Sequence, residues 1–533
     1  MKTVHFIPRR CLAFAALFGF GLIIAPAGLA AEIRRPNVLF IAVDDLRPEL
    51  GCYGRDYIKS PNIDRLARAG MVFDRAYCQQ AVCSPTRSSL MTGTRPDTTK
   101  VWDLLTHFRT ALPDVVTLQQ NFKNHGYFVQ GMGKIYHGAF DDPPSWSVPW
   151  QTPKAVIYAL SENSSRSPIK IEGEPDDSVP APKVRKKKGR GAASAKSAPD
   201  SVNEDEVNSR GPAFECANVP DNTYQDGKVA DLAVSTLRTL SKKSEPFFLA
   251  VGFIKPHLPF VAPKKYWDLY DPAKIKLAPN PFRQIDAPAY AVKTAGELRK
   301  YRGIPEGHIP DDLARKLKHG YYAAVSYTDA QVGKVLDELD RLGLGGNTIV
   351  VLWGDHGWKL GEHDAWCKHS NVENDVNAPL ILSVPGMKHA GTHTPALVEY
   401  VDVYPTLSEL AGMPLPGHLE GTSFKPLLDD PNRPWKPAVF SQYPRPPAKT
   451  GGGPLMGYSM RTDRYRFTVW VGRDDHTKVD AIELYDHQND PLENTNVAKI
   501  PGQTATVEQL MAQWKKGWQG AKPPAASAPA TNQ

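Results

Sequence analysis

The stretch Pro36-Asn-Val-Leu-Phe-Ile-Ala-Val-Asp-Asp45 is a near-continuous apolar run that ends in two carboxylates. The runs Pro246-Phe-Phe-Leu-Ala-Val-Gly-Phe253 and Asn347-Thr-Ile-Val-Val-Leu-Trp353 have the same form, and each is also followed by polar residues. Short apolar runs without alternation are typical of strands that are buried on both faces of a parallel sheet. The sequence therefore predicts a sheet whose strands end in polar clusters.

The segment between the second and third runs supplies a helix. Its apolar residues recur at helical spacing, which predicts an amphipathic crossover helix: Val332, Val335, Leu336, Leu339 and Leu342. Strands that alternate with helices indicate an α/β fold with a mainly parallel sheet. Ligands of such sheets bind at the carboxyl ends of the strands. We therefore expect Asp44-Asp45, Lys255-Pro-His257 and Asp355-His356 to lie near one another.

The first thirty residues have the composition of a secretory signal peptide. Lys2, Arg9 and Arg10 precede an apolar run over residues 11–24, and small residues lead to a predicted cleavage after Ala30. A transmembrane anchor is the alternative, but the run is short for a membrane span. No later segment is long and apolar enough to cross a bilayer. We expect an exported protein, periplasmic or secreted, with no stable membrane span.

The positive charge of the chain is concentrated in one segment. The formal net charge is +7, and it becomes −3 when the three basic residues of the leader and the seven of residues 183–196 are left out. A fold that is not broadly basic argues against nucleic acid as a partner. Residues 172–206 are rich in Pro, Ser, Ala, Lys and Asp, with few large apolar residues, so we predict a disordered basic insertion.

The remaining chain divides by its patterning. We expect a catalytic domain over residues 32–440. From residue 441 to 518, short alternating runs and turn residues predict a smaller antiparallel sheet, capped by a helix around 507–518. The tail over residues 519–533 is expected to be disordered.

Cys83 begins the strongest short motif, Cys83-Ser-Pro-Thr-Arg87. Ser84 is expected to cap a helix that Pro85 opens and that ends near Gly93. Cys83 would lie at the positive end of the helix dipole with Arg87 one turn away, which predicts an acidic thiol. The alternative is a buried structural cysteine. After removal of the leader five cysteines remain, so at least one is unpaired or modified.

A metal site is expected at the strand ends. Asp44, Asp45 and Asp355 offer hard carboxylate oxygens, which suit calcium or magnesium. Aspartates at strand ends are also common as turn formers and helix caps. Because two such aspartate clusters flank a candidate nucleophile, we favour a metal site over a turn or capping role.

The motifs resemble the formylglycine-dependent sulfatases of the alkaline-phosphatase-like superfamily, and within them the iduronate-2-sulfatase type. The resemblance extends over nearly the whole mature chain. The motifs that carry it are Asp44-Asp-Leu-Arg-Pro48, Cys83-Ser-Pro-Thr-Arg87, Arg95-Pro-Asp-Thr-Thr99, Gly133-Lys134 with His137, Lys255-Pro-His257, Asp355-His-Gly-Trp358, Gly361-Glu-His363 and Ser441-Gln-Tyr-Pro-Arg-Pro446. The resemblance implies an alkaline-phosphatase-like sheet flanked by helices, with a smaller C-terminal antiparallel subdomain.

The resemblance also implies the chemistry. A formylglycine-generating or sulfatase-maturing enzyme would oxidise Cys83 to formylglycine, whose hydrate attacks sulfur. Calcium is the family's usual ion, and the implied ligands are Asp44, Asp45, Asp355, His356 and an oxygen of the modified Cys83. The other implied site residues are Arg87 beside the nucleophile, Lys134 and Lys368 as sulfate clamps, His257 as general acid and His137 as an assistant in sulfate release.

The expected substrate is a sulfated oligosaccharide of the glycosaminoglycan type, cleaved at the 2-O-sulfate of a uronic acid. Arg445, Arg461 and His369 are candidates for binding its anionic groups. Cys216 lacks the disulfide partner that the family type has. Two alternatives stay open: a phosphomonoester or phosphonate hydrolase of the same superfamily, and an inactive polyanion-binding homologue.

Overall fold

A computed structural model describes residues 35–138, 140–164, 211–294, 296–445 and 454–524, together with positions 1 and 3. The expected signal peptide and the expected basic insertion lie outside these residues. The described residues from Arg35 onward cluster as one compact unit.

A seven-stranded sheet forms the centre of this unit, in the order β11-β2-β10-β7-β1-β5-β3. Its strands are β1 (Asn37–Val43), β2 (Met71–Tyr77), β3 (Phe128–Gly133), β5 (Phe247–Phe253), β7 (Thr348–Gly354), β10 (Leu380–Ser383) and β11 (Thr392–Glu399). Only β10 runs against the other six. The three apolar runs form β1, β5 and β7, which lie side by side in the middle of the sheet. The prediction of a mainly parallel α/β sheet is confirmed.

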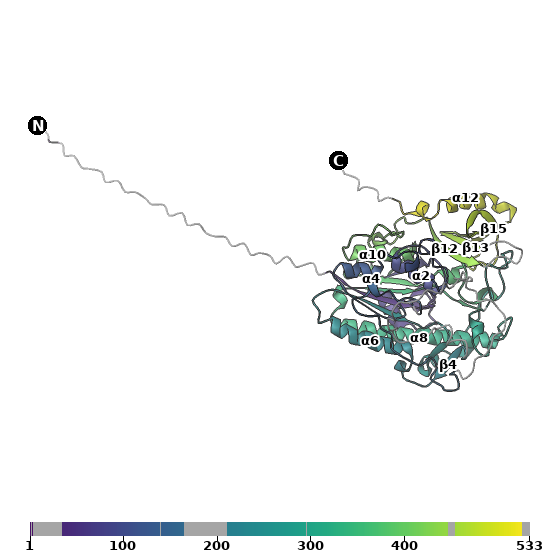
Figure 1. Cartoon of the computed structure of the whole chain (residues 1–533), viewed down its shortest axis with the longest axis horizontal. Helices are drawn as coiled ribbons and strands as arrows, with labels where there is room; N and C mark the ends of the chain where they lie inside the picture. Colours follow the sequence, from purple (N-terminus) through teal and green to yellow (C-terminus); the bar gives the residue numbers. More distant parts are fainter. Residues whose placement is uncertain are drawn as a thin grey trace, which may run out of the picture. The chain divides into compact units, whose positions relative to one another are not determined.

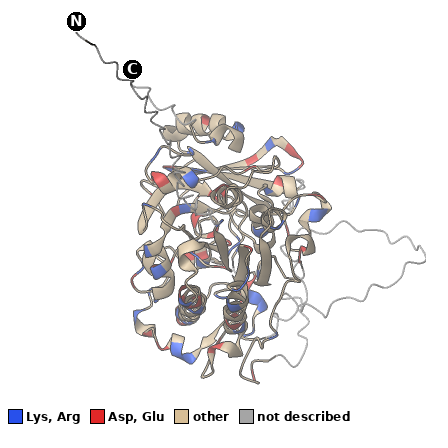
Figure 2. Cartoon of the chain, turned by 90° about the vertical axis from the view of Figure 1, so that its left-hand side faces the viewer, with Lys and Arg blue, Asp and Glu red and all other residues tan. Residues whose placement is uncertain are grey.

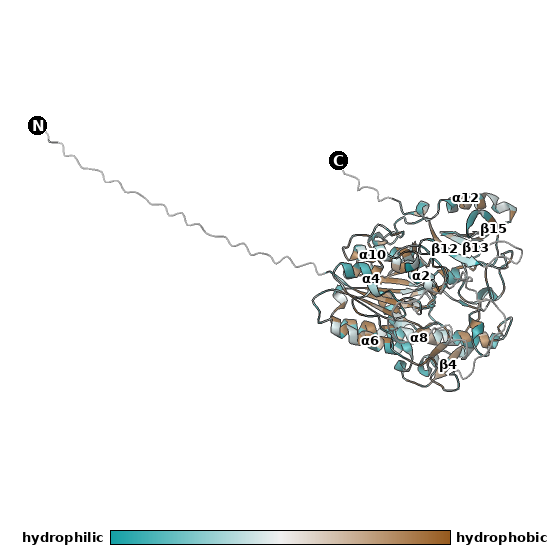
Figure 3. Cartoon of the chain, viewed as in Figure 1, coloured by the Kyte–Doolittle hydropathy of each residue, from teal (hydrophilic) through white to brown (hydrophobic). Residues whose placement is uncertain are grey.

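Helices cover both faces of the sheet, and successive residues of β1 face opposite layers. Leu39 and Ile41 pack with helices α6 (Gln225–Leu240) and α8 (Asp311–Arg341). Val38 and Phe40 belong to a second core with α2 (Cys83–Thr92), α4 (Leu118–Asn124) and α10 (Val403–Leu410). Figure 1 shows the two groups of helices on opposite sides of the strands, and α6 and α8 carry both brown and teal residues in Figure 3, as amphipathic helices do.

The other helices are short, and two small sheets accompany them. The helices are α1 (Pro61–Ala69), α3 (Pro96–Thr99), α7 (Lys264–Trp267), α9 (Glu373–Val376) and α11 (Lys425–Asp429). The small sheets pair β4 (Phe214–Ala217) with β6 (Phe260–Pro263) and β8 (Lys359–Leu360) with β9 (Trp366–Cys367).

A four-stranded antiparallel sheet follows, as expected for the C-terminal part. Its strands are β12 (Ala438–Arg445), β13 (Leu455–Thr462), β14 (Tyr465–Gly472) and β15 (Asp475–Asp486). Helix α12 (Thr504–Lys515) packs on it through Leu510. The sequence predicts a disordered tail from residue 519, whereas the 3-10 helix η11 (Trp518–Ala521) continues into that segment and buries Ala521.

Charged residues of both signs are interspersed along the described chain in Figure 2. None of the helices among the described residues has the length and apolar character that a membrane crossing requires.

Candidate active site

Helix α2 presents Cys83 at its first residue. Val82 precedes it in an extended conformation, and the amide of Thr86 donates to the Val82 carbonyl. The helix therefore begins two residues earlier than expected, and the prediction that Ser84 caps it is wrong, because no side chain caps this end. Gly93 ends the helix in the left-handed conformation, as predicted.

Arg87 connects three strand ends from one turn further along α2. Its Nη2 lies 3.0 Å from Asp44 Oδ1, and its Nε lies 3.1 Å from Asp355 Oδ2. Its Nη1 donates to the carbonyls of Lys134 and Ile135, which follow β3. The side chain is fully buried. A buried guanidinium with all these acceptors fixes the helix start against the edge of the sheet.

A second group of charges surrounds Asp45. Lys368 Nζ lies 3.2 Å from Asp45 Oδ1, and His257 Nε2 lies 3.8 Å from Asp45 Oδ2. Glu297, which sequence reasoning missed, contacts the same two cations: its Oε1 lies 3.0 Å from Lys368 Nζ and 3.3 Å from His257 Nε2. No motif marks Glu297, since it comes from the long connection between β6 and α8.

The ends of β1, β5 and β7 thus meet at one edge, as the sequence predicts. Lys134, after β3, lies 2.6 Å from Asp44 Oδ2 through its Nζ. His356 Nε2 lies 3.3 Å from Cys83 Sγ and 3.4 Å from Asp45 Oδ1. His137 lines a small cavity together with Ser84 and Arg87. The catalytic and metal-ligand residues proposed from sequence therefore lie in this one region.

Two overlapping sets of side chains offer ligand atoms within 4.8 Å of one another: Asp44, Cys83, Asp355 and His356 form one set, and Asp44, Asp45, Cys83 and His257 form the other. Two of the four side chains in each set are carboxylates, and carboxylate oxygens are the preferred ligands of hard divalent cations. The residues present therefore fit a divalent metal ion.

Burial and charge set the protonation of these groups. Burial by itself raises the pKa of Asp44, but Lys134 and Arg87 outweigh it and hold that pKa well below its usual range. Burial raises the pKa of Asp45 to about 6, against the opposing charge of Lys368. For Glu297, the opposing charges of Lys368 and His257 outweigh burial and hold the pKa well below the usual range.

The expectation of an acidic thiol at Cys83 is wrong. Burial, with the nearby charge of Asp44, raises the pKa of this thiol well above its usual value. The side chain is only 2% exposed. The favourable field of a helix start is therefore outweighed by the loss of water around the sulfur. All five cysteines of the described residues are free, Cys216 among them.

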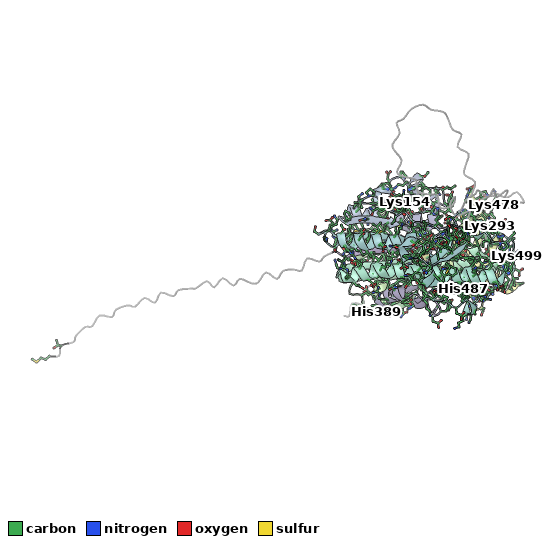
Figure 4. The ribbon with its side chains drawn as sticks, turned by 90° about the horizontal axis from the view of Figure 1, so that it is seen from below. Lys154, Lys293, His389, Lys478, His487 and Lys499 are labelled. Atoms are coloured by element: carbon green, nitrogen blue, oxygen red, sulfur yellow. The ribbon has the colours of Figure 1, made fainter. Side chains whose placement is uncertain are left out.

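The three residues considered for binding substrate anions have structural partners. Arg445 is buried and donates to the carbonyls of Tyr290, Ala291 and His369. Arg461 is buried beside Glu373, and it contacts His487, which is labelled in Figure 4. His369 Nε2 lies 3.9 Å from Glu297 Oε2. Of these three residues, His369 is therefore the one whose side chain lies beside the charged group around Asp45.

Comparison with known families identifies the chain. The model of the sulfatase family matches residues 36–413, which hold the site described above. A second model, described as N-sulphoglucosamine sulphohydrolase, C-terminal, matches residues 361–519, which include the antiparallel sheet.

Individual relatives agree with the family match. Iduronate 2-sulfatase of Mus musculus is 35% identical, in an alignment that covers 86% of this chain and 90% of that protein. A structure solved in complex with its substrate, D-glucosamine-2-N,6-O-disulfate, has a TM-score of 0.66 at 20% identity, covering 93% of this chain and all of the other. The phosphonate monoester hydrolase of Silicibacter pomeroyi has a TM-score of 0.67 at 21% identity, covering 91% and 96%. The fold is thus alkaline-phosphatase-like, and the chain belongs to the sulfatase family of sulfuric ester hydrolases.

Proposed function

We propose that the chain removes the 2-O-sulfate of a uronic acid from a sulfated oligosaccharide of the glycosaminoglycan type. The observation that carries the proposal is the convergence of Cys83 with the ends of β1, β3, β5 and β7. The identity to an iduronate 2-sulfatase, over nine tenths of that protein, supports the substrate class.

Fixed cations would bind the sulfate group. Lys134 contacts Asp44, and Lys368 contacts Asp45. Both lysines are nearly fully buried, so their attraction for an anionic ligand is screened little by water. Positive groups aimed at the sulfuryl oxygens stabilise the charge that develops as the S–O bond breaks.

His257 is assigned as the general acid for the departing sugar oxygen. Its Nδ1 lies 2.6 Å from the carbonyl oxygen of Leu258, and because a carbonyl only accepts, Nδ1 donates there. The Nε2 atom faces Glu297 and donates a proton only in the imidazolium form. Burial by itself lowers the pKa of His257, but Asp45 and Glu297 outweigh it and raise that pKa, which favours this form. His137, in the cavity shared with Ser84 and Arg87, is assigned to the release of sulfate.

Asp44, Asp45, Asp355, His356 and the modified residue 83 would hold one Ca²⁺ ion. When bound, the ion supplies positive charge that favours an ionised oxygen nucleophile and neutralises the sulfate. Arg87 contacts two of these aspartates and thereby keeps the carboxylates oriented toward one another.

Oxidation of Cys83 to formylglycine by a maturing enzyme supplies an aldehyde whose hydrate provides the attacking oxygen. The raised pKa of the thiol supports the need for this modification, since the unmodified group is a poor thiolate source at neutral pH. The leader-like residues 1–30 further support export of the chain, periplasmic or secreted.

Sulfate release from a defined set of sulfated disaccharides tests the proposal. We expect release from a terminal 2-O-sulfated uronic acid, and a peptide spanning residue 83 that is about 18 Da lighter than the cysteine form, as the replacement of the thiol by an aldehyde requires. Phosphonate or phosphate monoester turnover without sulfate release would overturn the proposal. Binding of the disaccharides without turnover, with an unmodified Cys83, would instead indicate an inactive polyanion-binding protein.

A further inference from the structure

Glu297 reaches the site from outside every sequence motif. It precedes a short 3-10 helix, η6 (Leu298–Lys300), in the connection between β6 and α8. Leu298 and Tyr301, on either side of this turn, are buried in the core that contains α6 and α8. The amide of Arg302 donates to the carbonyl of Gly211. Glu297 is therefore held in place by buried neighbours on its C-terminal side.

The Glu297 carboxylate contacts both His257, assigned as the general acid for the sugar oxygen, and Lys368, assigned to the sulfate group. One oxygen, Oε1, lies 3.0 Å from Lys368 Nζ and 3.3 Å from His257 Nε2. The side chain is 16% exposed, so these contacts are only weakly screened by water. Asp45 is the other carboxylate that contacts both cations.

Asp45 and Glu297 differ in what else they can bind. Asp45 belongs to a set of possible metal ligands, whereas neither of the sets around Cys83 includes Glu297. Because Glu297 lies outside these ligand sets, it can keep its contacts with Lys368 and His257 when Asp45 binds a metal ion. Such outer partners orient the groups that carry out the chemistry.

Only a few contacts determine the orientation of the His257 ring. Its backbone turn is fixed by Lys255, whose Nζ donates to the carbonyls of His257 and Pro259. Its Nδ1 is occupied by the Leu258 carbonyl, and its ring lies 6.4 Å from that of Trp358. The direction of Nε2 is then set by the carboxylate in front of it. Lys368 is confined in a similar way, because its Nζ lies 4.8 Å from the centre of the Trp358 ring.

We propose that Glu297 is a positioning residue for the leaving-group side of the reaction, acting through its contacts with Lys368 and His257. The inference rests on the proposed function, in which these two residues touch the sulfate ester. When the attacking oxygen of residue 83 forms a bond to sulfur, the sulfuryl group leaves the sugar oxygen, which keeps the electron pair of the broken S–O bond and takes a proton from His257. A misplaced acid slows this step most when the leaving oxygen is strongly basic.

The dependence on the leaving group separates positioning from a general structural role. A sugar hydroxyl is a poor leaving group that needs the proton, whereas 4-nitrophenol leaves readily as its anion. We expect Glu297→Gln to lower kcat/KM about 100-fold for a sulfated disaccharide and less than about 10-fold for 4-nitrophenyl sulfate. Glu297→Asp keeps the charge and should recover part of the loss on the disaccharide.

The matched control is Glu338→Gln. Glu338 of α8 is also nearly buried and also accepts from two cations, Arg238 and Arg341. This variant should change neither rate. Thermal melting of both glutamine variants, in the full chain with residue 83 modified, checks that they are folded.

Equal losses on the two esters, or no loss in Glu297→Gln, would overturn the positioning role. If Glu297→Gln does not fold, the ratio of the two rates in Glu297→Asp decides, and an unchanged ratio rejects the inference. Wild-type protein that hydrolyses neither ester would reject the proposed function first, and this inference with it.

Discussion

Two charge clusters of the described chain, one buried and the other partly buried, could each supply ligands to a cation, and they differ in how their carboxylates are occupied. One lies at the carboxyl ends of the central strands around Asp44, Asp355 and His356, and the other comprises Glu373, His487 and Glu493. In the second cluster Arg466 contacts both glutamates and donates to Ser459.

The partners of the two clusters explain the difference. Tyr77 and Asn377 donate to one oxygen of Glu373, and the backbone amide of Glu373 donates to Glu493. Arg466 and these donors together occupy both oxygens of Glu373 and both oxygens of Glu493, whereas Arg87 at the sheet edge contacts only one oxygen each of Asp44 and Asp355. At the sheet edge, the lysines that face Asp44 and Asp45 have flexible stems, which can give way to an ion or turn to an anion. Nearness of ligand atoms alone therefore does not define a metal site.

The largest expected effect is on catalysis at the sheet edge. Cys83→Ala should abolish sulfate release, by at least about 10⁴-fold in kcat, as expected when a nucleophile is removed. Melting temperature should stay close to that of the wild type, because the change is small and apolar. Turnover above one percent of the wild type would show that residue 83 is not the nucleophile.

The second cluster should instead control stability. Arg466→Met leaves Glu373 and Glu493 without their shared buried cation and should lower the free energy of unfolding by about 3–5 kcal/mol. Denaturant titration measures this loss, and kcat per folded molecule should not change. A variant as stable as the wild type would show that the cluster contributes little to the fold.

Calcium should distinguish the clusters directly. At a concentration 100 times its Kd, the ion should stabilise the wild type by about 2.7 kcal/mol. Asp45→Asn should lose this gain, and Glu493→Gln should keep it. Thermal unfolding in Ca²⁺ and in a chelator makes the comparison, with calorimetric titration as a second readout. A gain that survives in Asp45→Asn but not in Glu493→Gln would reverse the assignment.

The smallest effect on stability is expected for Arg464, which lies two positions before Arg466 in the sequence. Arg464 pairs with Asp486 through Nη2 at 2.7 Å, and its side chain is 46% exposed. Arg464→Met should cost less than about 1 kcal/mol, because exposed ion pairs are screened and entropically costly. Denaturant midpoints of the Arg464 and Arg466 variants, measured side by side, test whether burial sets the difference. Equal costs would contradict this explanation.

The sequence was most informative for functional residues that directly follow a strand. Asp44, His257 and Asp355 could be placed together because β1, β5 and β7 are apolar throughout and end beside them. Glu297 could not be found in this way, since a single glutamate in a long connection has no periodic pattern around it. The error over the Cys83 thiol has a related cause. The helix start was recognised from sequence, but the burial that outweighs it depends on the packed core.

The burial of α2 bears on whether Cys83 is modified before or after the chain folds. All ten residues of this helix are buried, Cys83 at its start included. A maturing enzyme must bring its own active site within bonding distance of the sulfur, which the completed fold prevents. The oxidation proposed for Cys83 would therefore precede folding. The cell that makes the protein would have to deliver it to the maturing enzyme as an open chain, and a copy that folded first would stay permanently inactive.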